Sequence, residues 1–315
     1  MSVLLELGVP VAESKKPKGR WYRITQYCIT WWSFVTSAFF TNVPQRSVIM
    51  GGEHLKLKAG RIFALTHRTL WDSFWIGAAI IIRNLKCLFF NQKLIPLNLP
   101  DGTNFMGTKL LRLFMGLLRC LPVFRADVMN RHGENADEQK VRDRNEETWN
   151  DLKEHLRNGG TVLWFMTSGR DLIVENGQVV DGTCVSRPNF MLGRLVLECH
   201  ELGIEVDVVP GYTVNNSQTY RKTRDALVGW WWNLIPSQLA FRKFLKSMCW
   251  YLAFRPFRYA NKDCLVANFG PPLSRDFLKS KAGNRAAHRQ AFNIAQAVNQ
   301  AIRELKPTVD QFRSS

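Results

Sequence analysis

The stretch that decides the fold reads Ile62-Phe63-Ala64-Leu65-Thr66-His67-Arg68-Thr69-Leu70-Trp71-Asp72. Its first four residues form an apolar run, which predicts a buried β-strand. His67 and Asp72 lie five positions apart, whereas side chains that share a helix face are three or four apart. The stretch therefore predicts a strand, a turn that carries His67, and a helix whose first turn carries Asp72, where the helix N-terminus favours a carboxylate.

A histidine and an aspartate placed in this way can act as a base and as the group that orients it. Asp72 would hold one imidazole nitrogen of His67, and the other nitrogen would be free to take a proton from a hydroxyl group. Of the six histidines in the chain, His67 is the one with a carboxylate so placed after a strand. The alternative interpretation is that His67 caps the helix and Asp72 is an ordinary first-turn acid.

Apolar runs typical of strands alternate with helical stretches along residues 45–275, which predicts an α/β fold with a mixed β-sheet flanked by helices. Helical spacing of apolar residues is clearest in residues 134–157 and 286–305. No linker rich in proline, glycine or serine divides the chain, so we expect an N-terminal basic segment with an interfacial helix (1–44) and one domain (45–315). The expected apolar faces of the two helices consist of Val141, Trp149, Leu152 and Leu156, and of Ala291, Ile294, Ala295, Val298 and Ile302.

The order of several motifs resembles the His-x4-Asp family of glycerol-phosphate and lysophosphatidate acyltransferases. The resemblance covers roughly residues 45–275, and it implies that family's α/β fold, with an N-terminal helical segment before it. One departure is Thr66, which stands where the family commonly has asparagine before the histidine. Besides His67 and Asp72, the motifs that carry the resemblance are, in chain order, residues 48–55, 60–62, 88–94, 105–107, 121–125, 161–171, 206–212 and 265–273.

A second departure concerns the third motif, which in the family is usually Phe-Pro-Glu-Gly-Thr-Arg. Phe165 and Arg170 match it, but Met166 replaces the proline and Thr167 replaces the glutamate. Residues 168–171, Ser-Gly-Arg-Asp, are closer to the Ser-Gly-Gly-Arg-Asp run of plant plastid glycerol-3-phosphate acyltransferases, with one glycine fewer. The missing glutamate leaves the details of acceptor binding open, but it leaves the proton chemistry unchanged.

The resemblance implies a role for each motif residue. His67 would deprotonate an acceptor hydroxyl and Asp72 would orient it, while the planar forks of Arg125 and Arg170 would hold the acceptor's phosphate. Taken alone, Arg125 could instead be a surface arginine, and Arg170 could be an ion-pair partner of Asp171. Direct attack on a thioester needs no enzyme nucleophile, no metal and no cofactor, and the sequence has no Gly-x-Ser-x-Gly motif. The other expected substrate-binding residues are Lys93, Thr167, Ser168 and Gly169, where a turn at Ser168–Gly169 could offer backbone N–H groups to an anion.

The expected reaction moves a fatty acyl group from acyl-CoA or acyl carrier protein to a hydroxyl of glycerol-3-phosphate or 1-acylglycerol-3-phosphate. A first alternative is a related acyltransferase whose acceptor is another lysophospholipid or a glycolipid. A second alternative is a non-catalytic protein on the same scaffold, whose basic and aromatic residues bind a membrane or a nucleic acid.

The formal net charge of +17 favours anionic partners. Residues 221–262 hold nine lysines and arginines against a single acid, Asp225, together with three consecutive tryptophans, Trp230, Trp231 and Trp232. Cations mixed with tryptophan suit a membrane interface, and no nucleic-acid-binding motif is present. We therefore expect a membrane surface as a partner and no nucleic acid.

Residues 24–45 contain no charged side chain, and several of them are aromatic. A bilayer span needs ~20 apolar residues, but this segment is interrupted by threonine, serine and glutamine, so a helix in or near the interface is favoured over a span. The seven cysteines are scattered and have no zinc-site spacing, which indicates free thiols in a reducing compartment. Together these features predict a cytoplasmic protein that associates peripherally with the cytoplasmic face of a membrane.

Overall fold

The fold is described from a computed structural model of the whole chain. The structure describes residues 19–42, 46–66, 72–86, 94–100, 102, 109–124, 138–165, 172–175, 178–181, 189–214 and 264–315.

A six-stranded mixed sheet, in the order β1-β8-β7-β2-β4-β3, forms the centre of the molecule. The strands β7, β2, β4 and β3 are mutually parallel, whereas β8 is antiparallel to β7 and pairs in parallel with β1 at the edge. The predicted α/β class with a mixed sheet flanked by helices is thereby confirmed. The bounds are β1 (Ser47–Met50), β2 (Arg61–Leu65), β3 (Leu97–Asn98), β4 (Val162–Phe165), β7 (Asp207–Val214) and β8 (Leu265–Phe269).

The central strand β2 is buried over its whole length, as the apolar run predicted. Because successive side chains of a strand point to opposite faces, Phe63 and Leu65 enter one core cluster and Ile62 and Ala64 enter another. A strand that is covered on both faces needs apolar residues at every position, which explains why the run lacks alternation.

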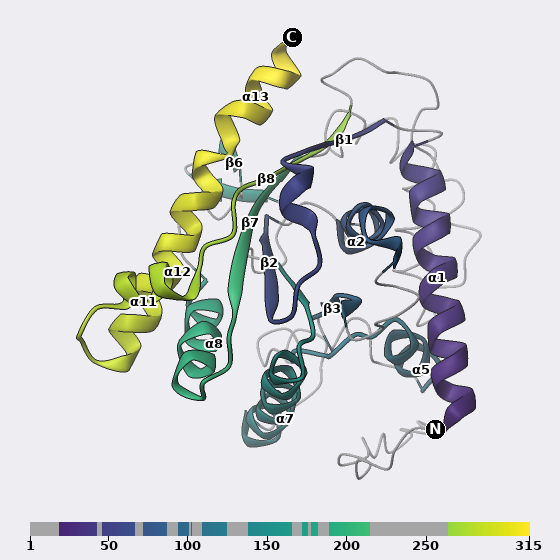
Figure 1. The fold of residues 1–315 in the computed structure, drawn as a ribbon, viewed down its shortest axis with the longest axis horizontal. Helices are drawn as coiled ribbons and strands as arrows, with labels where there is room; N and C mark the ends of the chain where they lie inside the picture. Colours follow the sequence, from purple (N-terminus) through teal and green to yellow (C-terminus); the bar gives the residue numbers. More distant parts are fainter. Residues whose placement is uncertain are drawn as a thin grey trace, which may run out of the picture.

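Helices cover both faces of the sheet, so that the molecule has three layers (Figure 1). The face of Phe63 and Leu65 is covered by α2 (Asp72–Arg83), and α1 (Arg20–Asn42) packs on the outer side of α2. The opposite face is covered by α7 (Glu138–Arg157), α8 (Phe190–Glu201), α11 (Arg275–Ala282) and α12 (Ala287–Glu304). The remaining elements are the short helix η1 (Gly52–Leu55), α5 (Lys109–Leu117), α13 (Lys306–Ser314) and a separate antiparallel hairpin of β5 (Leu172–Glu175) and β6 (Gln178–Asp181).

The two predicted amphipathic helices correspond to α7 and α12. The five residues expected on the apolar face of α12 are all buried, as are Val141, Leu152 and Leu156 of α7. Gly159 ends α7 with a positive φ of 77°, a conformation that glycine adopts without steric strain. Residues 134–137 of the first predicted helix lie outside the described ranges.

The connections from two neighbouring strands leave the sheet toward opposite faces. After β2 the next described element is α2, which covers one face; after β4 come the β5–β6 hairpin and then α8, which covers the other face (Figure 1). In open α/β sheets, such a switch opens a crevice outside the carboxyl ends of the two strands, where ligands commonly bind. The sequence places the predicted base just after β2 and the third motif just after β4, on either side of this switch.

The predicted N-terminal helix is present as α1, which begins four residues earlier than the uncharged segment. In the portion of the chain that the structure describes, no helix is both long enough and apolar enough to cross a membrane.

Candidate functional site

Asp72 is the first residue of α2, as predicted, and its exposed fraction is 0%. The indole nitrogen of Trp75, one turn later, donates a hydrogen bond of 3.1 Å to its Oδ1. Trp75 and Ile76 pack in the same core cluster as Leu65 of β2, which ties the start of α2 to that strand. Burying a carboxylate costs free energy unless other groups compensate its negative charge. The N-terminus of α2 provides part of this compensation, because a helix N-terminus favours negative charge.

His67 lies outside the described residues, but Thr66, which precedes it, is described in detail. Thr66 is fully buried, and its backbone N–H donates to Gly211 O of β7 at 3.1 Å. Its Oγ1 accepts a hydrogen bond of 2.7 Å from the backbone N–H of Thr213 and donates to Thr213 O at 3.2 Å. In return, Thr213 Oγ1 donates to Thr66 O at 3.0 Å. We call this reciprocal pair the threonine clasp; it fixes the carboxyl end of β2 immediately before His67.

The third motif follows the neighbouring strand. In the parallel register of β2 and β4, Leu65 pairs with Phe165, so the two strands end at the same level. Leu65 also pairs with Gly211 of β7, and all three strands run in the same direction at this point. The motif residues Thr167, Ser168, Gly169 and Arg170 lie outside the described residues.

The predicted strand of residues 121–125 is present in a reduced form. Leu121 N donates to Asn98 O at 2.8 Å and Val123 N to Pro100 O at 3.0 Å, which forms a short parallel ladder beside β3 and its extension. Phe124 is then held on both backbone groups by the amide of Asn145, with distances of 2.8 Å each. Arg125, the next residue, lies outside the described residues.

Sequence analysis missed the two residues of α7 that hold this segment. Asn145 binds Phe124, and Thr148 Oγ1 donates to Pro122 O at 2.8 Å. A signal was present, because positions 145 and 148 continue the spacing of the apolar face of α7 yet carry polar side chains. Polar residues within an otherwise apolar helix face indicate that a neighbouring backbone segment needs hydrogen-bond partners.

Lys93 also lies outside the described residues. The residue after it, Leu94, accepts a hydrogen bond of 2.6 Å from Thr161 Oγ1, just before β4 begins. Leu94 is therefore at the amino end of β4, whereas Phe165 is at the carboxyl end.

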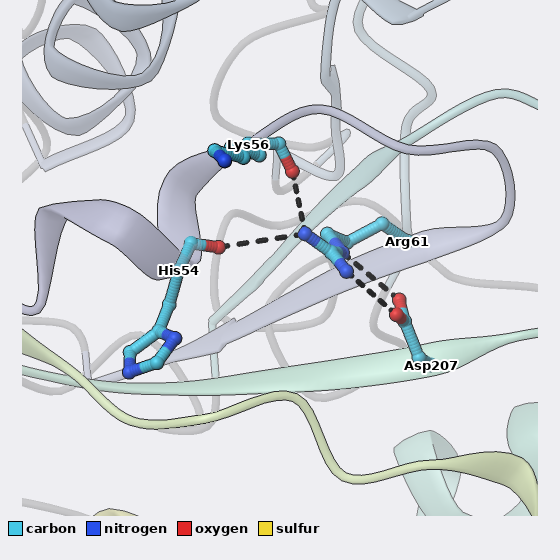
Figure 2. Close-up of polar contacts among 4 residues, drawn as sticks. All are labelled: His54, Lys56, Arg61 and Asp207. Carbon is cyan, nitrogen blue, oxygen red and sulfur yellow. Dashed lines mark hydrogen bonds and ion pairs between the residues drawn. The ribbon is translucent and has the colours of Figure 1, made fainter.

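A second buried polar cluster, which sequence analysis also missed, occupies the amino end of the same sheet (Figure 2). Arg61 begins β2 and Asp207 begins β7, and the two are register partners. The guanidinium donates from Nε to Oδ1 at 3.0 Å and from Nη2 to Oδ2 at 2.7 Å. Its Nη1 donates to Lys56 O at 2.5 Å and lies 3.5 Å from His54 O. All three nitrogens of the guanidinium therefore have acceptors, as expected of a structural ion pair.

Two histidines, the partly buried His155 and the buried His200, lie near this amino end and are held neutral. Burial, assisted by the positive charge of Arg119, lowers the pKa of His155 from 6.5 to about 4. Burial, assisted by Arg275 and Lys279, lowers the pKa of His200 to about 4 as well. Neither ring nitrogen of His200 has a hydrogen-bond partner. His155 lies shortly before β4, and its Nε2 donates a hydrogen bond of 3.0 Å to Thr161 O.

Two of the described cysteines, Cys120 and Cys199, are poor candidates for a nucleophile. Cys28, Cys120 and Cys199 are free thiols, and burial raises the pKa of Cys120 and of Cys199 to about 12. A thiol with so high a pKa is almost wholly protonated at neutral pH and therefore unreactive. Within the described ranges, no group of His, Cys, Asp or Glu side chains is arranged to hold a metal ion.

Comparison with known proteins adds no relative: no model of a protein family matches the chain, and no curated protein matches it. The assignment of a function therefore depends on the motifs and on the geometry around Asp72.

Proposed function

We propose that the protein is a glycerolipid O-acyltransferase of the His-x4-Asp type. It would move a fatty acyl group from a thioester of coenzyme A or acyl carrier protein to a hydroxyl of glycerol-3-phosphate or 1-acylglycerol-3-phosphate. The observation that carries the proposal is the fully buried Asp72 at the N-terminus of α2, close after the end of β2.

A fully buried carboxylate is retained at a cost in folding free energy, which favours a role that needs it. Only five residues lie between Asp72 and Thr66, whose backbone is fixed by the threonine clasp. This short link supports a contact between Asp72 and the side chain of His67, because the residues on both sides of 67–71 are held in place.

The chemical step follows from these roles. Asp72 would orient the imidazole of His67, which would take the proton of the acceptor hydroxyl as its oxygen attacks the thioester carbonyl. The tetrahedral intermediate would collapse with cleavage of the carbon–sulfur bond, and the proton on His67 would pass to the departing thiolate. The products are an oxygen ester and a free thiol, so the histidine returns to its neutral form.

Phosphate binding is assigned to Arg125 and Arg170. Arg125 follows Phe124, which Asn145 holds in place, and Arg170 comes five residues after the end of β4. Segments that leave parallel strands at the same edge can converge on one ligand, which supports a site that two arginines share. Thr167, Ser168 and Gly169 would add hydroxyl and backbone donors to the phosphate. Lys93 would help to bind the anionic substrate.

The proposed enzyme would work at the cytoplasmic face of a membrane, bound peripherally. A basic chain of net charge +17 suits both an anionic lipid surface and an anionic thioester donor. Residues 45–315 would form the acyltransferase domain, and α1, from the N-terminal part, packs directly on α2.

The test is thiol release from a long-chain acyl-CoA, with and without glycerol-3-phosphate or lysophosphatidate. His67→Ala should abolish acceptor-dependent release, whereas His288→Ala, which changes an exposed histidine of α12, should leave it unchanged. Near wild-type turnover by His67→Ala would refute the base assignment.

Two further results would change the assignment. Turnover of a phosphate-free acceptor that is as efficient as that of glycerol-3-phosphate would favour the alternative of a glycolipid or other acceptor. Absence of release with both acyl-CoA and acyl carrier protein thioesters, combined with binding to lipid or nucleic acid, would favour the non-catalytic alternative.

A further inference from the structure

The helix α1 carries large apolar side chains on its outer face. Trp21 is 80% exposed, Trp32 73%, Val35 55% and Ile24 42%, and Cys28 is exposed as well. These positions follow one another at intervals of three or four residues, so they lie along one side of the helix. We call this side, formed by Trp21, Ile24, Cys28, Trp32 and Val35, the α1 stripe.

The inner face of α1 carries polar groups that bind the rest of the protein. Gln26 Nε2 donates to Gly116 O at 2.8 Å, and the buried Thr30 donates from Oγ1 to Leu117 O at 3.2 Å. Both acceptors lie in the last turn of α5, where helix carbonyls lack partners within the helix. The usual arrangement of a surface helix is thus reversed in part: polar groups are buried, while two tryptophans face outward.

Packing of α1 on α2 fixes the direction in which the stripe faces. The ring of Phe34 occupies the space beside Gly77, where an added Cβ would lie 2.6 Å from Phe34 Cε1. Trp31 and Phe34 also pack with Ile81 of α2 and Ile95. Since this inner side is occupied by α2 and α5, the α1 stripe is turned away from the sheet. The helix α1 itself lies at the outer side of the molecule (Figure 1).

The charge of α1 points to the kind of surface that the stripe meets. Its two charged residues, Arg20 and Arg23, are both exposed, and the helix contains no acid. The ends of the stripe, Trp21 and Val35, are fourteen positions apart, which makes it about 21 Å long at the rise of an α-helix. Tryptophan and arginine on one exposed helix suit the headgroup region of an anionic bilayer, where indoles lie at the interface and cations meet lipid phosphates.

We propose that the α1 stripe docks the protein on the surface of an anionic lipid bilayer, with α1 lying in the plane of the interface. The inference rests on the proposed function in one respect: a bilayer would supply the lipid reactant. Because α1 packs on α2, docking through α1 would leave α1 alone between the bilayer and α2, whose first residue is Asp72. The membrane would therefore be a source of substrate for the site, in addition to holding the enzyme.

The binding test uses the full chain and sedimentation with vesicles of phosphatidylcholine containing about one third phosphatidylglycerol, an anionic lipid. Trp21→Ser/Trp32→Ser should lower the partition coefficient at least about tenfold, since each indole contributes a large apolar area. The matched control is Leu202→Ser/Phe277→Ser, which removes two exposed apolar side chains from the opposite face of the sheet. The control should bind within about twofold of the wild type.

Wild-type binding that persists in Trp21→Ser/Trp32→Ser would overturn the proposal. Equal binding to pure phosphatidylcholine would overturn the anionic part of it. Gel filtration tests whether the stripe instead contacts a second copy of the chain. A wild-type dimer that becomes monomeric in the stripe variant, with no vesicle binding by either protein, would show such a contact.

A soluble assay separates this proposal from the proposed function. With a short-chain acyl-CoA and glycerol-3-phosphate and no vesicles, the stripe variant should retain wild-type turnover. With lysophosphatidate embedded in anionic vesicles, its turnover should fall in proportion to its binding. Vesicle binding through the stripe by a wild type that shows no turnover in either assay would refute the acyltransferase assignment and leave docking intact.

Discussion

The two ends of strands β2 and β7 are built on different principles. At the amino end, Arg61 and Asp207 form a two-pronged ion pair, and backbone carbonyls take the remaining guanidinium donors (Figure 2). At the carboxyl end, the strands are joined by the neutral threonine clasp, and the nearby charge is the buried Asp72 of α2. At the amino end, the two charges neutralise each other between neighbouring strands. At the carboxyl end, a single carboxylate lies where the chain leaves β2 for α2.

The difference indicates separate tasks for the two ends. Removing one partner of a buried ion pair leaves an uncompensated charge and destabilises the fold. A carboxylate at a helix N-terminus beside a switch point is a position where a protein can bind and react. Variants at the amino end should therefore change stability, and variants at the carboxyl end should change turnover.

The largest effect is expected for Asp72→Asn. The amide keeps the shape of the side chain and can still accept the hydrogen bond from Trp75, but it cannot stabilise a protonated imidazole. We expect acceptor-dependent turnover to fall roughly 10²–10⁴-fold. The unfolding midpoint in urea should not fall, because the variant no longer buries a carboxylate. Asp276→Asn, in the first turn of α11, is the matched control and should change neither quantity. Full turnover by Asp72→Asn would remove the distinction between the two ends.

The next effect is expected at the amino end, for Arg61→Met. Loss of the guanidinium leaves the largely buried Asp207 without its partner, so the free energy of unfolding should fall by up to about 3–5 kcal/mol, measured by urea unfolding. Turnover per folded molecule should be unchanged. The double variant Arg61→Met/Asp207→Leu should recover most of the lost stability, because no unpaired charge remains. A defect in turnover by the folded single variant would show that the two ends are coupled.

A smaller effect, on both quantities, is expected for Thr66→Val. Valine matches the shape of threonine but leaves the backbone N–H of Thr213 without its acceptor, which should lower the free energy of unfolding by about 1–3 kcal/mol. Because the clasp fixes the chain just before His67, turnover should fall as well. Thr213→Val and the double variant complete a thermodynamic cycle. Additive losses in stability would mean that the clasp does not act as a unit.

The smallest expected effect is a loss of folding stability at acid pH. His155 and His200, both near the amino ends of parallel strands, have a pKa of about 4 in the folded protein, against 6.5 as the ordinary value. Above pH 6.5 neither the folded nor the unfolded state binds the proton; as the pH falls from 6.5 toward 4, only the unfolded state binds it, so stability is lost. His200→Phe should reduce this loss by on the order of 1–2 kcal/mol between pH 7 and 5. An unchanged pH dependence of urea unfolding would contradict the assignment.

Local patterns in the sequence were sufficient for part of this picture. The run before Thr66 predicted β2, the apolar spacing predicted α7 and α12, and the position of Asp72 in the first turn of a helix was correct. Each of these depends on residues that are close in the chain, and periodicity records such relations.

What the sequence could not provide were relations between distant residues. Arg61 and Asp207 are 146 positions apart, and nothing local marks them as neighbours. The helices α11 and α13 were not predicted, and the capping of α5 by Gln26 and Thr30 depends on how α1 packs. The roles of His67, Lys93, Arg125 and residues 167–170 stay predictions, because these residues lie outside the described ranges.

The order of the strands also has a consequence for how the chain matures during its synthesis. Leu65 pairs with Phe165 on one side and with Gly211 on the other, so β2 lacks both neighbours until much later residues have been made. At about 5–20 residues per second, Gly211 follows Leu65 after roughly 7–30 s. Pairings between such distant segments also make folding intrinsically slow. A ribosome-bound chain that stops before residue 207 therefore lacks both the ion pair and the clasp, and its central strand is exposed to other chains along one edge.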